Sequence, residues 1–370
     1  MQRGLQEWVE YLLATPGEKY DLSSIARHHP DLAEFAGDID LEPSFRWSGE
    51  LHGAKDIVDN IIETQKYDLV PDNVMPISGG TSMAIFLACM ALLRPGDEVV
   101  CQSPGWQQVP SICKRMNIRI KEWDLRSEDN WQPDTDKLKE LVTPATKLIY
   151  INFPHNPTGC IIDTDKMAEI CNIASRYGAY VLSDEINRGL EWDENLLSPC
   201  AANLYKRSIS AASMSKSFGA TGIRYGWFAT KDKKLYGDCY DIYYNSFLCN
   251  NHPSEIIARS LLKPENYSKL MKESIEIGKK NLDFLHKTIE ENEQWSWTPP
   301  GGSFSCFLKY HTGELSWDFF KRMINNKPIG VEFVPGSCFS EKCEYHVRIG
   351  FGNRHYHFTQ GLNLLIQSAG

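Results

Sequence analysis

The sequence predicts an α/β fold in which a large domain carries a mainly parallel sheet and a smaller α/β domain follows it. Short apolar segments with strand character alternate with longer helical segments from about Asp72 onward, and such alternation is typical of parallel strands joined by helices. The length of 370 residues is too great for one small core and fits two domains. The segment 82–93 is apolar on nearly all sides, as expected of a buried helix.

The elements of the larger part are expected in a regular order. The helix 82–93 ends at Arg94-Pro95-Gly96-Asp97, where Pro and Gly disfavour its continuation. A second helix is expected over 165–177, because Gly178 follows it as a typical C-terminal residue. Functional residues of parallel sheets collect beyond the carboxyl ends of strands, so a site is expected in the loops there. Strands are expected at 98–101, 147–152, 180–183, 209–212 and 227–229.

The pattern changes near Asn251-His252-Pro253. Beyond this point the sequence predicts a long helix over 268–291, a strand over 304–308, a strand around Val347 and a final helix. The predicted division is an N-terminal arm that packs with the small domain (1–46), a large domain (47–255) and a small C-terminal domain (256–370).

Composition narrows the class of protein. The net charge of −9 argues against a duplex nucleic-acid partner, which requires a basic face. The longest apolar run, 84–93, is about half of a membrane crossing, and the N-terminus lacks the apolar stretch of a secretory signal. Eleven cysteines without C-x-x-C spacing indicate free thiols in a reducing compartment. We therefore expect a cytoplasmic protein with a small-molecule substrate.

A lysine-containing loop gives the first indication of chemistry. Lys216 lies in the run Ser213-Met214-Ser215-Lys216-Ser217, and Arg224 follows eight residues after the lysine. The amine can form a Schiff base with an aldehyde, while the hydroxyls and the guanidinium can bind a phosphate. Pyridoxal 5′-phosphate carries both groups on one ring. A lysine in a Ser-rich stretch is more often a solvated surface residue. The assignment of this cofactor therefore depends on the residues in the other loops.

Three further loops and one aromatic residue fit the same cofactor. Ser78-Gly79-Gly80-Thr81-Ser82 precedes the apolar helix and can bind phosphate, although it can equally be an ordinary capped turn. The run 152–159 (NFPHNPTG) follows a strand and fixes the amide of Asn156. Asp184 ends the next strand, where a carboxylate can pair with a protonated pyridine nitrogen. Trp106 offers a face that can stack on a ring, but taken alone suits a core residue.

In this combination the chain resembles the fold-type-I pyridoxal-phosphate enzymes of the class I/II aminotransferase family, from about Trp47 to the C-terminus. The resemblance implies that Lys216 is the Schiff-base lysine and that Asp184 is the partner of the pyridine nitrogen. It also implies that Asn156 donates to the phenolic oxygen of the ring, near the substrate, and that Trp106 stacks on the ring. The remaining implied cofactor-binding residues are Gly80, Thr81, Ser82, Asn187, Ser213, Ser215 and Arg224.

The resemblance also implies a substrate-binding residue and an assembly. Arg348, in the run YHVRIG, matches the arginine that binds the α-carboxylate of the substrate, a role that suits a bidentate guanidinium. The family implies an obligate homodimer with active sites at the subunit interface. No metal is expected, since the adjacent His28 and His29 would point to different faces of a helix.

One departure from the family pattern bears on the reaction. The family usually has Tyr three residues after the aspartate, whereas this chain has Asn187, an amide that is a weaker donor to the same ring oxygen. Cyclases of the capreomycidine synthase type also lack the tyrosine. They resemble this chain in the run 152–159, in Tyr20-Asp21-Leu22-Ser23-Ser24, in Pro300-Gly301-Gly302 and in Arg348-Ile349-Gly350-Phe351.

Three hypotheses for the activity follow. The hypothesis that the sequence favours is a lyase that eliminates the hydroxyl of a hydroxylated L-arginine and closes the guanidine into a cyclic amino acid such as enduracididine or capreomycidine. The alternative is an aminotransferase of class I/II. The third, a non-catalytic relative of the fold, should carry a basic DNA-binding segment, and none is visible. Candidate partners for a guanidinium substrate are Glu185, Glu18 and Asp21, although each suits a surface carboxylate better.

Overall fold

The computed structural model describes residues 4–39, 49–193 and 195–368. Its largest element is a seven-stranded sheet with the strand order β2-β8-β7-β6-β5-β3-β4. Neighbouring strands are parallel except at β8, which runs against β2 and β7. The strands are β2 (Val74–Ser78), β3 (Glu98–Ser103), β4 (Arg119–Asp124), β5 (Thr146–Asn152), β6 (Tyr180–Asp184), β7 (Ser208–Ser213) and β8 (Tyr225–Ala229).

Helices cover both faces of this sheet because successive side chains of a strand point to opposite sides. In β3, Val99 and Cys101 pack on one face, whereas Val100 packs on the other. The first face is covered by α3 (Thr81–Leu92), α4 (Gln108–Arg115) and α8 (Lys233–Phe247). The second is covered by α2 (Lys55–Thr64), α5 (Thr135–Leu141), α6 (Thr164–Tyr177), α7 (Ala201–Leu204) and α9 (His252–Leu261).

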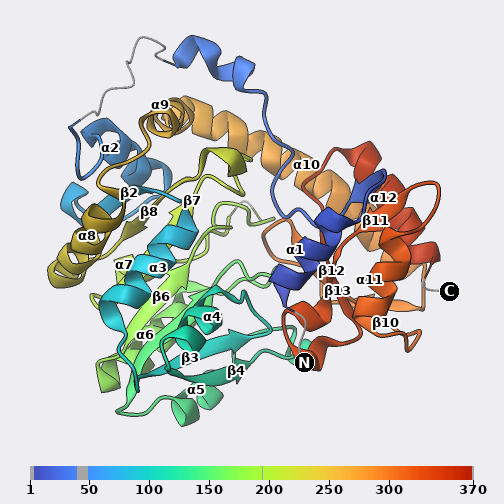
Figure 1. Cartoon of the computed structure of the whole chain (residues 1–370), viewed down its shortest axis with the longest axis horizontal. Coiled ribbons are helices and arrows are strands. Elements are labelled where there is room, and N and C mark those ends of the chain that lie inside the picture. The colour runs from blue at the N-terminus through green and yellow to red at the C-terminus, as the bar shows by residue number, and fades with distance from the viewer. Residues whose placement is uncertain (1–3, 40–48, 194, 369–370) are drawn as a thin grey trace.

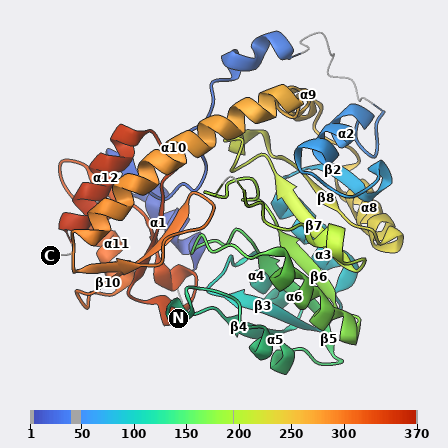
Figure 2. The same cartoon turned by 180° about the vertical axis from the view of Figure 1, so that it is seen from behind.

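The C-terminal part is built on a four-stranded antiparallel sheet with the order β12-β13-β10-β9. Its strands are β9 (Trp295–Trp297), β10 (Ser305–Tyr310), β12 (Val334–Pro335) and β13 (His346–Gly350). The long helix α10 (Pro264–Glu290) extends from α9 to this part and packs there against α12 (His355–Gln367), with α11 (Ser316–Ile324) close by (Figures 1 and 2).

The N-terminal residues pack with the C-terminal part. β1 (Lys19–Asp21) pairs in parallel with β11 (Gly330–Glu332), and α1 (Leu5–Ala14) lies between the two halves of the molecule (Figure 1). A short 3-10 helix, η1 (Leu32–Asp38), follows. The expected boundary at residues 46 and 47 lies outside the described residues, and residues 255 and 256 both lie within α9, so the division into domains stays a prediction.

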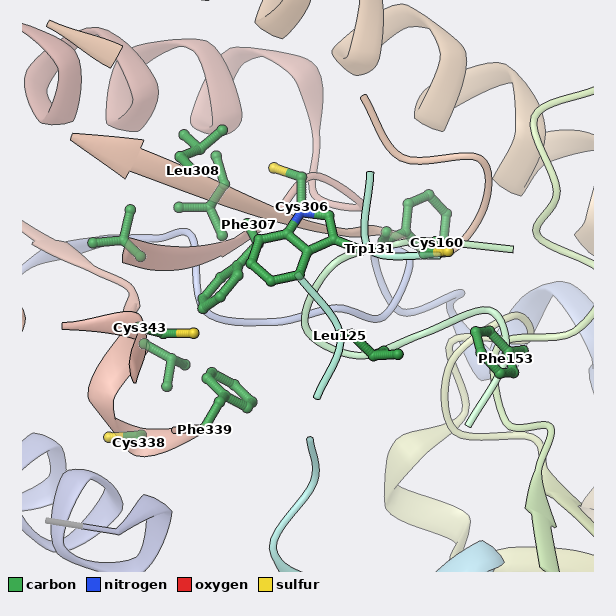
Figure 3. Packing of buried hydrophobic residues seen from close by; sticks show 14 of the residues in the cluster. Leu125, Trp131, Phe153, Cys160, Cys306, Phe307, Leu308, Cys338, Phe339 and Cys343 are labelled. Carbon is green, nitrogen blue, oxygen red and sulfur yellow. The ribbon is translucent and has the colours of Figure 1, made fainter. Parts of the chain in front are cut away.

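One apolar cluster joins the two parts (Figure 3). Leu125 and Phe153 follow β4 and β5 of the large sheet, whereas Phe307 lies in β10 of the smaller one. The ring of Trp131 lies between them, 5.6 Å from that of Phe307. Because these side chains are nearly fully buried, they hold the loops after β4 and β5 against the C-terminal part.

The structure confirms the α/β fold with a mainly parallel sheet. Each strand and helix given a range in the sequence prediction is present, with ends shifted by at most about four residues, as is usual for such boundaries. Among the strands of the large sheet, β2 and β4 were not predicted individually. β4 lies at the edge of the sheet, where Arg119 and Glu122 are exposed, so it lacks the apolar run of a buried strand. Within the described residues, none of the helices combines the length and the apolar character of a transmembrane segment.

Candidate active site

The loops at the carboxyl ends of the central strands surround a cavity of about 380 Å³. The register of the sheet pairs Asn152 with Asp184 and Asp184 with Ala211, so β5, β6 and β7 end side by side. The cavity is lined by all of the cofactor- and substrate-binding residues expected from the sequence except Gly80. They are Thr81, Ser82, Trp106, Asn156, Asp184, Asn187, Ser213, Ser215, Lys216, Arg224 and Arg348.

Lys216 lies in the loop that follows β7, three residues after its last residue, with its side chain at the wall of this cavity. Its carbonyl accepts hydrogen bonds from Gly219 N (3.1 Å) and Arg27 N (3.3 Å), which fix the loop. Burial lowers the pKa of the amine to about 8, and the positive charge of Arg348 adds to this effect, whereas the charge of Asp184 opposes it. A lysine with this pKa is partly neutral near physiological pH and can act as a nucleophile or a base.

Asp184 is the last residue of β6 and is only 6% exposed. Its carboxylate accepts hydrogen bonds from Ile186 N (3.2 Å) and from the Tyr150 hydroxyl (3.4 Å). Burial raises the pKa of this carboxyl to about 7, although both hydrogen bonds and the charge of Lys216 oppose the rise. A buried carboxylate can stabilise a positive charge that a ligand brings into the cavity.

A chain of hydrogen bonds connects the ends of β5 and β6 to the C-terminal part. Asn152 donates from Nδ2 to the carbonyl of Asp184 (2.8 Å), and its Oδ1 accepts from Asn156 N (2.8 Å). Oδ1 of Asn156 in turn accepts from Nη1 of Arg348 (3.3 Å). Because an arginine can only donate, this contact orients the Asn156 amide, whose Nδ2 has no partner among the described residues.

Arg348 comes from β13 and is only 5% exposed. Its Nη2 donates to the carbonyl of Ser23, and its guanidinium lies over the ring of Phe339 at 5.5 Å. Nε is buried without a hydrogen-bond partner in the described part of the chain. Burial lowers the pKa of Arg348 to about 10. The guanidinium therefore remains charged near neutral pH and retains donor capacity for an anion.

The loop between β2 and α3 forms the other wall together with the lysine loop. Arg224 donates to Gly79 O (3.0 Å), Thr221 O (3.2 Å) and Ser215 Oγ (3.4 Å). The buried hydroxyl of Thr81, at the N-terminus of α3, has no partner among the described residues. A Cβ at Gly226 would lie 2.8 Å from Gly80 Cα, so the strand can approach this loop only as glycine. Hydroxyls, a guanidinium and a helix N-terminus together suit a phosphate group.

Asn187 was expected to donate its amide to the ring, and its side chain lines the cavity. The residue is fully buried and its Nδ2 donates to the carbonyl of Pro154 at 3.1 Å. Oδ1 has no partner among the described residues, and the bond to Pro154 uses one of the two N–H donors of Nδ2. One N–H of the amide is thus engaged by the proline carbonyl, and the role of Asn187 as a weak donor to the ring stays a prediction.

The carboxylates considered for a guanidinium substrate do not line the cavity. Glu185 is buried, and its Oε1 accepts from Ser210 Oγ (2.5 Å) and Ala201 N (3.0 Å). Asp21 accepts from the backbone of Ser23 (2.7 Å) and Ser24 (3.0 Å) and so shapes the arm. Glu18 is exposed just before β1. Within the described lining, Asp184 is the carboxylate that a ligand can reach.

Sequence reasoning missed the contribution of the N-terminal arm. Leu5, Trp8 and Val9 of α1 line the cavity, as do Ser23, Ser24 and Ile25 after β1. The spacing of Leu5, Trp8, Val9 and Leu12 is that of an amphipathic helix and gave a usable signal. Nothing local, however, shows which surface such a helix covers. Further lining residues not predicted are Ile85, Gln108, Asn152, Ile186 and Thr221.

Comparisons with known proteins agree with this arrangement. The family described as aminotransferase class I and II matches residues 15–356. A probable aspartate aminotransferase of Methanocaldococcus jannaschii is 26% identical over 316 residues, which are 84% of this chain and 81% of that protein. A crystal structure of a PLP-dependent aminotransferase from Streptococcus suis superposes with a TM-score of 0.88 at 28% identity, covering 98% of this chain and 96% of that one.

A third relative bears on the reaction. Capreomycidine synthase of Streptomyces vinaceus is 33% identical over 157 residues, which are 42% of this chain and 40% of that protein. Enzymes of the matched family depend on pyridoxal 5′-phosphate, and the hydroxyls, the guanidinium, the lysine and the buried carboxylate of this cavity fit that cofactor. The chain belongs to the class I and II aminotransferase family, has the fold of type I pyridoxal-phosphate enzymes and uses pyridoxal 5′-phosphate as its cofactor.

Proposed function

We propose that this protein is an aminotransferase that moves the amino group of an amino acid to a keto acid. The observation that supports this most directly is that Lys216, Asp184 and Arg348, from β7, β6 and β13, line one cavity. These three residues supply a base, an anionic partner for a heterocycle and a carboxylate-binding group. The family match and the relatives named as aminotransferases support the same reaction.

Each residue is proposed to have a separate role. Nε and the remaining donor capacity of Arg348 bind the α-carboxylate of the substrate and so orient its Cα–H bond. Lys216 Nζ, whose pKa is lowered to about 8, takes the Cα proton as general base and can return it elsewhere. The bound cofactor supplies an electron sink, and the Asp184 carboxylate favours the protonated ring nitrogen on which that property depends.

The cofactor-binding roles follow from the same geometry. The contact with Arg348 engages Oδ1 of Asn156 and leaves Nδ2 as the donor. We propose that Nδ2 donates to the phenolic oxygen of the ring. Trp106 is 37% exposed at the cavity and is proposed to stack on the ring. The phosphate is proposed to lie against the first turn of α3 and the lysine loop, through the groups of Gly80, Thr81, Ser82, Ser213, Ser215 and Arg224.

A cyclase of hydroxylated arginine is the second candidate. It is favoured by Asn187, which replaces the usual tyrosine, and by the partial likeness to capreomycidine synthase. In that reaction the side-chain hydroxyl leaves as water and a guanidine nitrogen forms the new bond to carbon within the same molecule. The described lining provides no carboxylate besides Asp184 to bind the guanidinium, so the aminotransferase is the better-supported proposal.

One experiment separates the two reactions. The holoenzyme is incubated with single amino acids, with arginine and with its β- and γ-hydroxylated forms, each with and without pyruvate, and the products are identified by mass spectrometry. An aminotransferase gives a keto acid and alanine in equal amounts, and only when pyruvate is present. A cyclic product formed from a hydroxyarginine without pyruvate would overturn the proposal in favour of the cyclase.

We also propose a homodimer, the common state of family members. Exposed apolar side chains lie on α3 and on α8, two helices that pack against each other. They are Phe86 and Met90 of α3 and Tyr244 and Phe247 of α8, with Leu248 directly after it. Since Ser82 and Ile85 of α3 line the cavity, a partner bound to this surface would lie next to the active site.

A further inference from the structure

A buried tyrosine hydroxyl lies beside the Asp184 carboxylate. Tyr150 is in β5 and Asp184 ends the neighbouring strand β6, and the two residues are 3% and 6% exposed. The register pairs Tyr150 with Leu182, two residues before Asp184, so the three side chains point to the same face of the sheet. Tyr150 Oη lies 3.4 Å from Asp184 Oδ2, its one hydrogen-bond partner among the described residues. The contact is made within one sheet and does not depend on a second subunit.

We infer that Tyr150 is a positioning residue, whose hydroxyl orients the Asp184 carboxylate and keeps the proton that this carboxylate shares with the cofactor on the ring nitrogen. Tyr150 does not belong to the cavity lining, so it acts through Asp184 and not on the ligand itself. The inference rests on the proposed function, in which Asp184 is the anionic partner of the ring nitrogen.

Each oxygen of the Asp184 carboxylate accepts from one donor. Ile186 N donates to Oδ1 at 3.2 Å, and the Tyr150 hydroxyl donates to Oδ2. Two donors at opposite ends hinder rotation of the carboxylate, and each oxygen retains a lone pair for a ring N–H. Burial raises the pKa of Asp184 to about 7, although both hydrogen bonds oppose the rise. Of the nearby charges, that of Glu185 raises this pKa further and that of Lys216 lowers it.

The direction of the hydrogen bond follows from the surroundings of the hydroxyl. Burial raises the pKa of Tyr150 well above its usual value, and the charge of Asp184 adds to this effect. The thiols of Cys101 and Cys89 act in the same sense. Tyr150 therefore stays protonated, and its O–H is a donor to the ionised carboxylate.

This donor decides where the shared proton lies. A carboxylate paired with a ring nitrogen shares one proton with it, and the two groups titrate as a pair. A hydrogen bond to the anion makes the Asp184 carboxylate a weaker base, which leaves the proton on nitrogen. Without the hydroxyl, the buried carboxylate would take more of the proton. Because a ring nitrogen without its proton is a poorer electron sink, Tyr150 supports the property on which the proposed reaction depends.

A second tyrosine on the same face of the sheet provides a matched control. Tyr180, four residues before Asp184 in β6, donates to Asp232 Oδ2 at 2.8 Å. Asp232 lies at the N-terminus of α8 and is not in the cavity lining. Tyr180→Phe therefore removes a tyrosine–aspartate hydrogen bond from the same layer without changing the surroundings of Asp184.

The first test measures cofactor binding below and above the pKa of Asp184. The full-length apoprotein is titrated in a calorimeter with pyridoxamine 5′-phosphate, which cannot form a Schiff base with Lys216. At pH 6 the free carboxyl is protonated, so binding as an ion pair requires its ionisation, and Tyr150→Phe should weaken binding at least about threefold. At pH 9 the carboxylate is ionised before and after binding, so the hydroxyl stabilises both states and the difference should disappear.

The control and the contrary results are equally defined. Tyr180→Phe should bind pyridoxamine 5′-phosphate like the wild type at both pH values. Unchanged binding of Tyr150→Phe at pH 6, or weakening by the same factor at pH 6 and pH 9, would overturn the inference, because lost packing alone has no such pH dependence. If Tyr150→Phe does not fold, replacement of Tyr150 by 3-fluorotyrosine keeps the shape and makes the hydroxyl a stronger donor. Binding should then tighten at pH 6 but not at pH 9, and unchanged binding at pH 6 would overturn the inference.

The second test asks whether Tyr150 acts through Asp184. In the Asp184→Asn background the carboxylate is absent, so Tyr150→Phe should leave the dissociation constant of pyridoxamine 5′-phosphate at pH 6 unchanged within about twofold. A loss there as large as in the wild-type background would mean that the hydroxyl acts by another route, and the inference fails.

Failure of this inference can be distinguished from failure of the proposed function. If the pH-dependent weakening is found but amino acids and pyruvate give no alanine, the role of Tyr150 stands and the aminotransferase does not. If the wild type forms alanine but Tyr150→Phe binds pyridoxamine 5′-phosphate normally at pH 6, the function stands and the inference is wrong.

Discussion

At Lys216 two neighbouring charges and burial act on a single amine. Burial and Arg348 disfavour the charged form, Asp184 favours it, and the resulting pKa is about 8. Asp184 responds in the opposite sense, because burial raises its pKa to about 7. The two groups therefore titrate close to each other and near physiological pH. Such a pair is typical of a site that moves protons, since neither group is locked into one state.

The pH dependence of cofactor attachment follows from this pKa. Only the neutral amine of Lys216 can attack an aldehyde, so the rate of covalent attachment to the apoprotein should rise with pH through a midpoint of about 8. In Asp184→Asn the charge that raises the pKa of Lys216 is lost, so the midpoint should move to lower pH. Stopped-flow absorbance measures both. A wild-type midpoint near the ordinary lysine value would contradict the buried setting of this amine.

Removal of the amine itself should abolish the covalent link. Lys216→Ala is expected to lose the visible absorbance of lysine-bound cofactor and the adduct that borohydride reduces, together with all measurable turnover. Lys206→Ala is a suitable control, because Lys206 is exposed and lies outside the cavity lining. If Lys216→Ala retains a reducible adduct, mapping of the modified peptide would identify another lysine as the attachment site.

Asn187 is expected to tune the bound cofactor. Its Nδ2 already donates one N–H to the Pro154 carbonyl, so this neutral amide has at most one further N–H to stabilise a negative charge on the phenolic oxygen of the ring. Asn187→Tyr introduces a hydroxyl donor and should lower the pH at which the absorbance of the bound cofactor changes, as measured by spectrophotometric titration. Asn187→Leu, similar in size but without a donor, should not lower it. An identical titration of the tyrosine and leucine variants would mean that this side chain does not face the ring.

Among the elements, α6 shows how local sequence sets the limits of a helix. Asp163 accepts a hydrogen bond from Lys166 N (2.7 Å) at the N-terminus, and Gly178 adopts a left-handed conformation (φ 67°) at the C-terminus. Both signals are readable in the sequence, and the helix is found where it was predicted. β4 gave no such signal, because an edge strand with exposed charges resembles a loop in its composition.

Loss of this cap should destabilise the protein by a measurable amount. Asp163→Ala leaves the N–H of Lys166 without its side-chain partner and should lower the free energy of unfolding by about 1 kcal/mol. Urea unfolding followed by circular dichroism is the measurement. Asn172→Ala, on the exposed side of the same helix, should be neutral or slightly stabilising because alanine favours helices. Equal effects of the two variants would mean that Asp163 does not act as a cap.

At the scale of the whole molecule, the site exists only because the two halves are held together. Asp184 and Lys216 come from the large sheet, Arg348 comes from the small one, and α1 contacts both. The apolar cluster of Figure 3 holds these parts in a fixed relation without using any of the proposed catalytic residues. The side chains that pack the two parts together are thus different from those proposed to be catalytic.

The proposed dimer makes a prediction for the exposed apolar surface on α3 and α8. Phe86 is 38% exposed, and Phe86→Asp would place a charge in the proposed interface, so the protein should shift toward monomer in light scattering. Leu204→Asp is the control, because Leu204 is 42% exposed on α7, on the opposite face of the sheet. If Phe86→Asp has the same mass and concentration dependence as Leu204→Asp, this surface is not the interface.

The sequence by itself determined the fold class, the cofactor and most of the residues proposed to bind it. Lys216, Asp184, Asn156 and the glycine-rich loop follow strands, and strand ends of one parallel sheet meet at one edge, so their proximity can be predicted from local patterns. The free thiols are also as expected, since all eleven cysteines are unpaired, although the cytoplasmic location stays a prediction.

Only the tertiary structure decided what lies opposite the cofactor-binding edge. It showed that α1 supplies an apolar part of the cavity lining, that Glu185 points into the core and that the amide of Asn187 is already engaged by Pro154. The physical reason is the distance along the chain over which each contact is made. The direction of a side chain at a strand end depends on its own backbone. The surface that an amphipathic helix covers depends instead on contacts with residues hundreds of positions away.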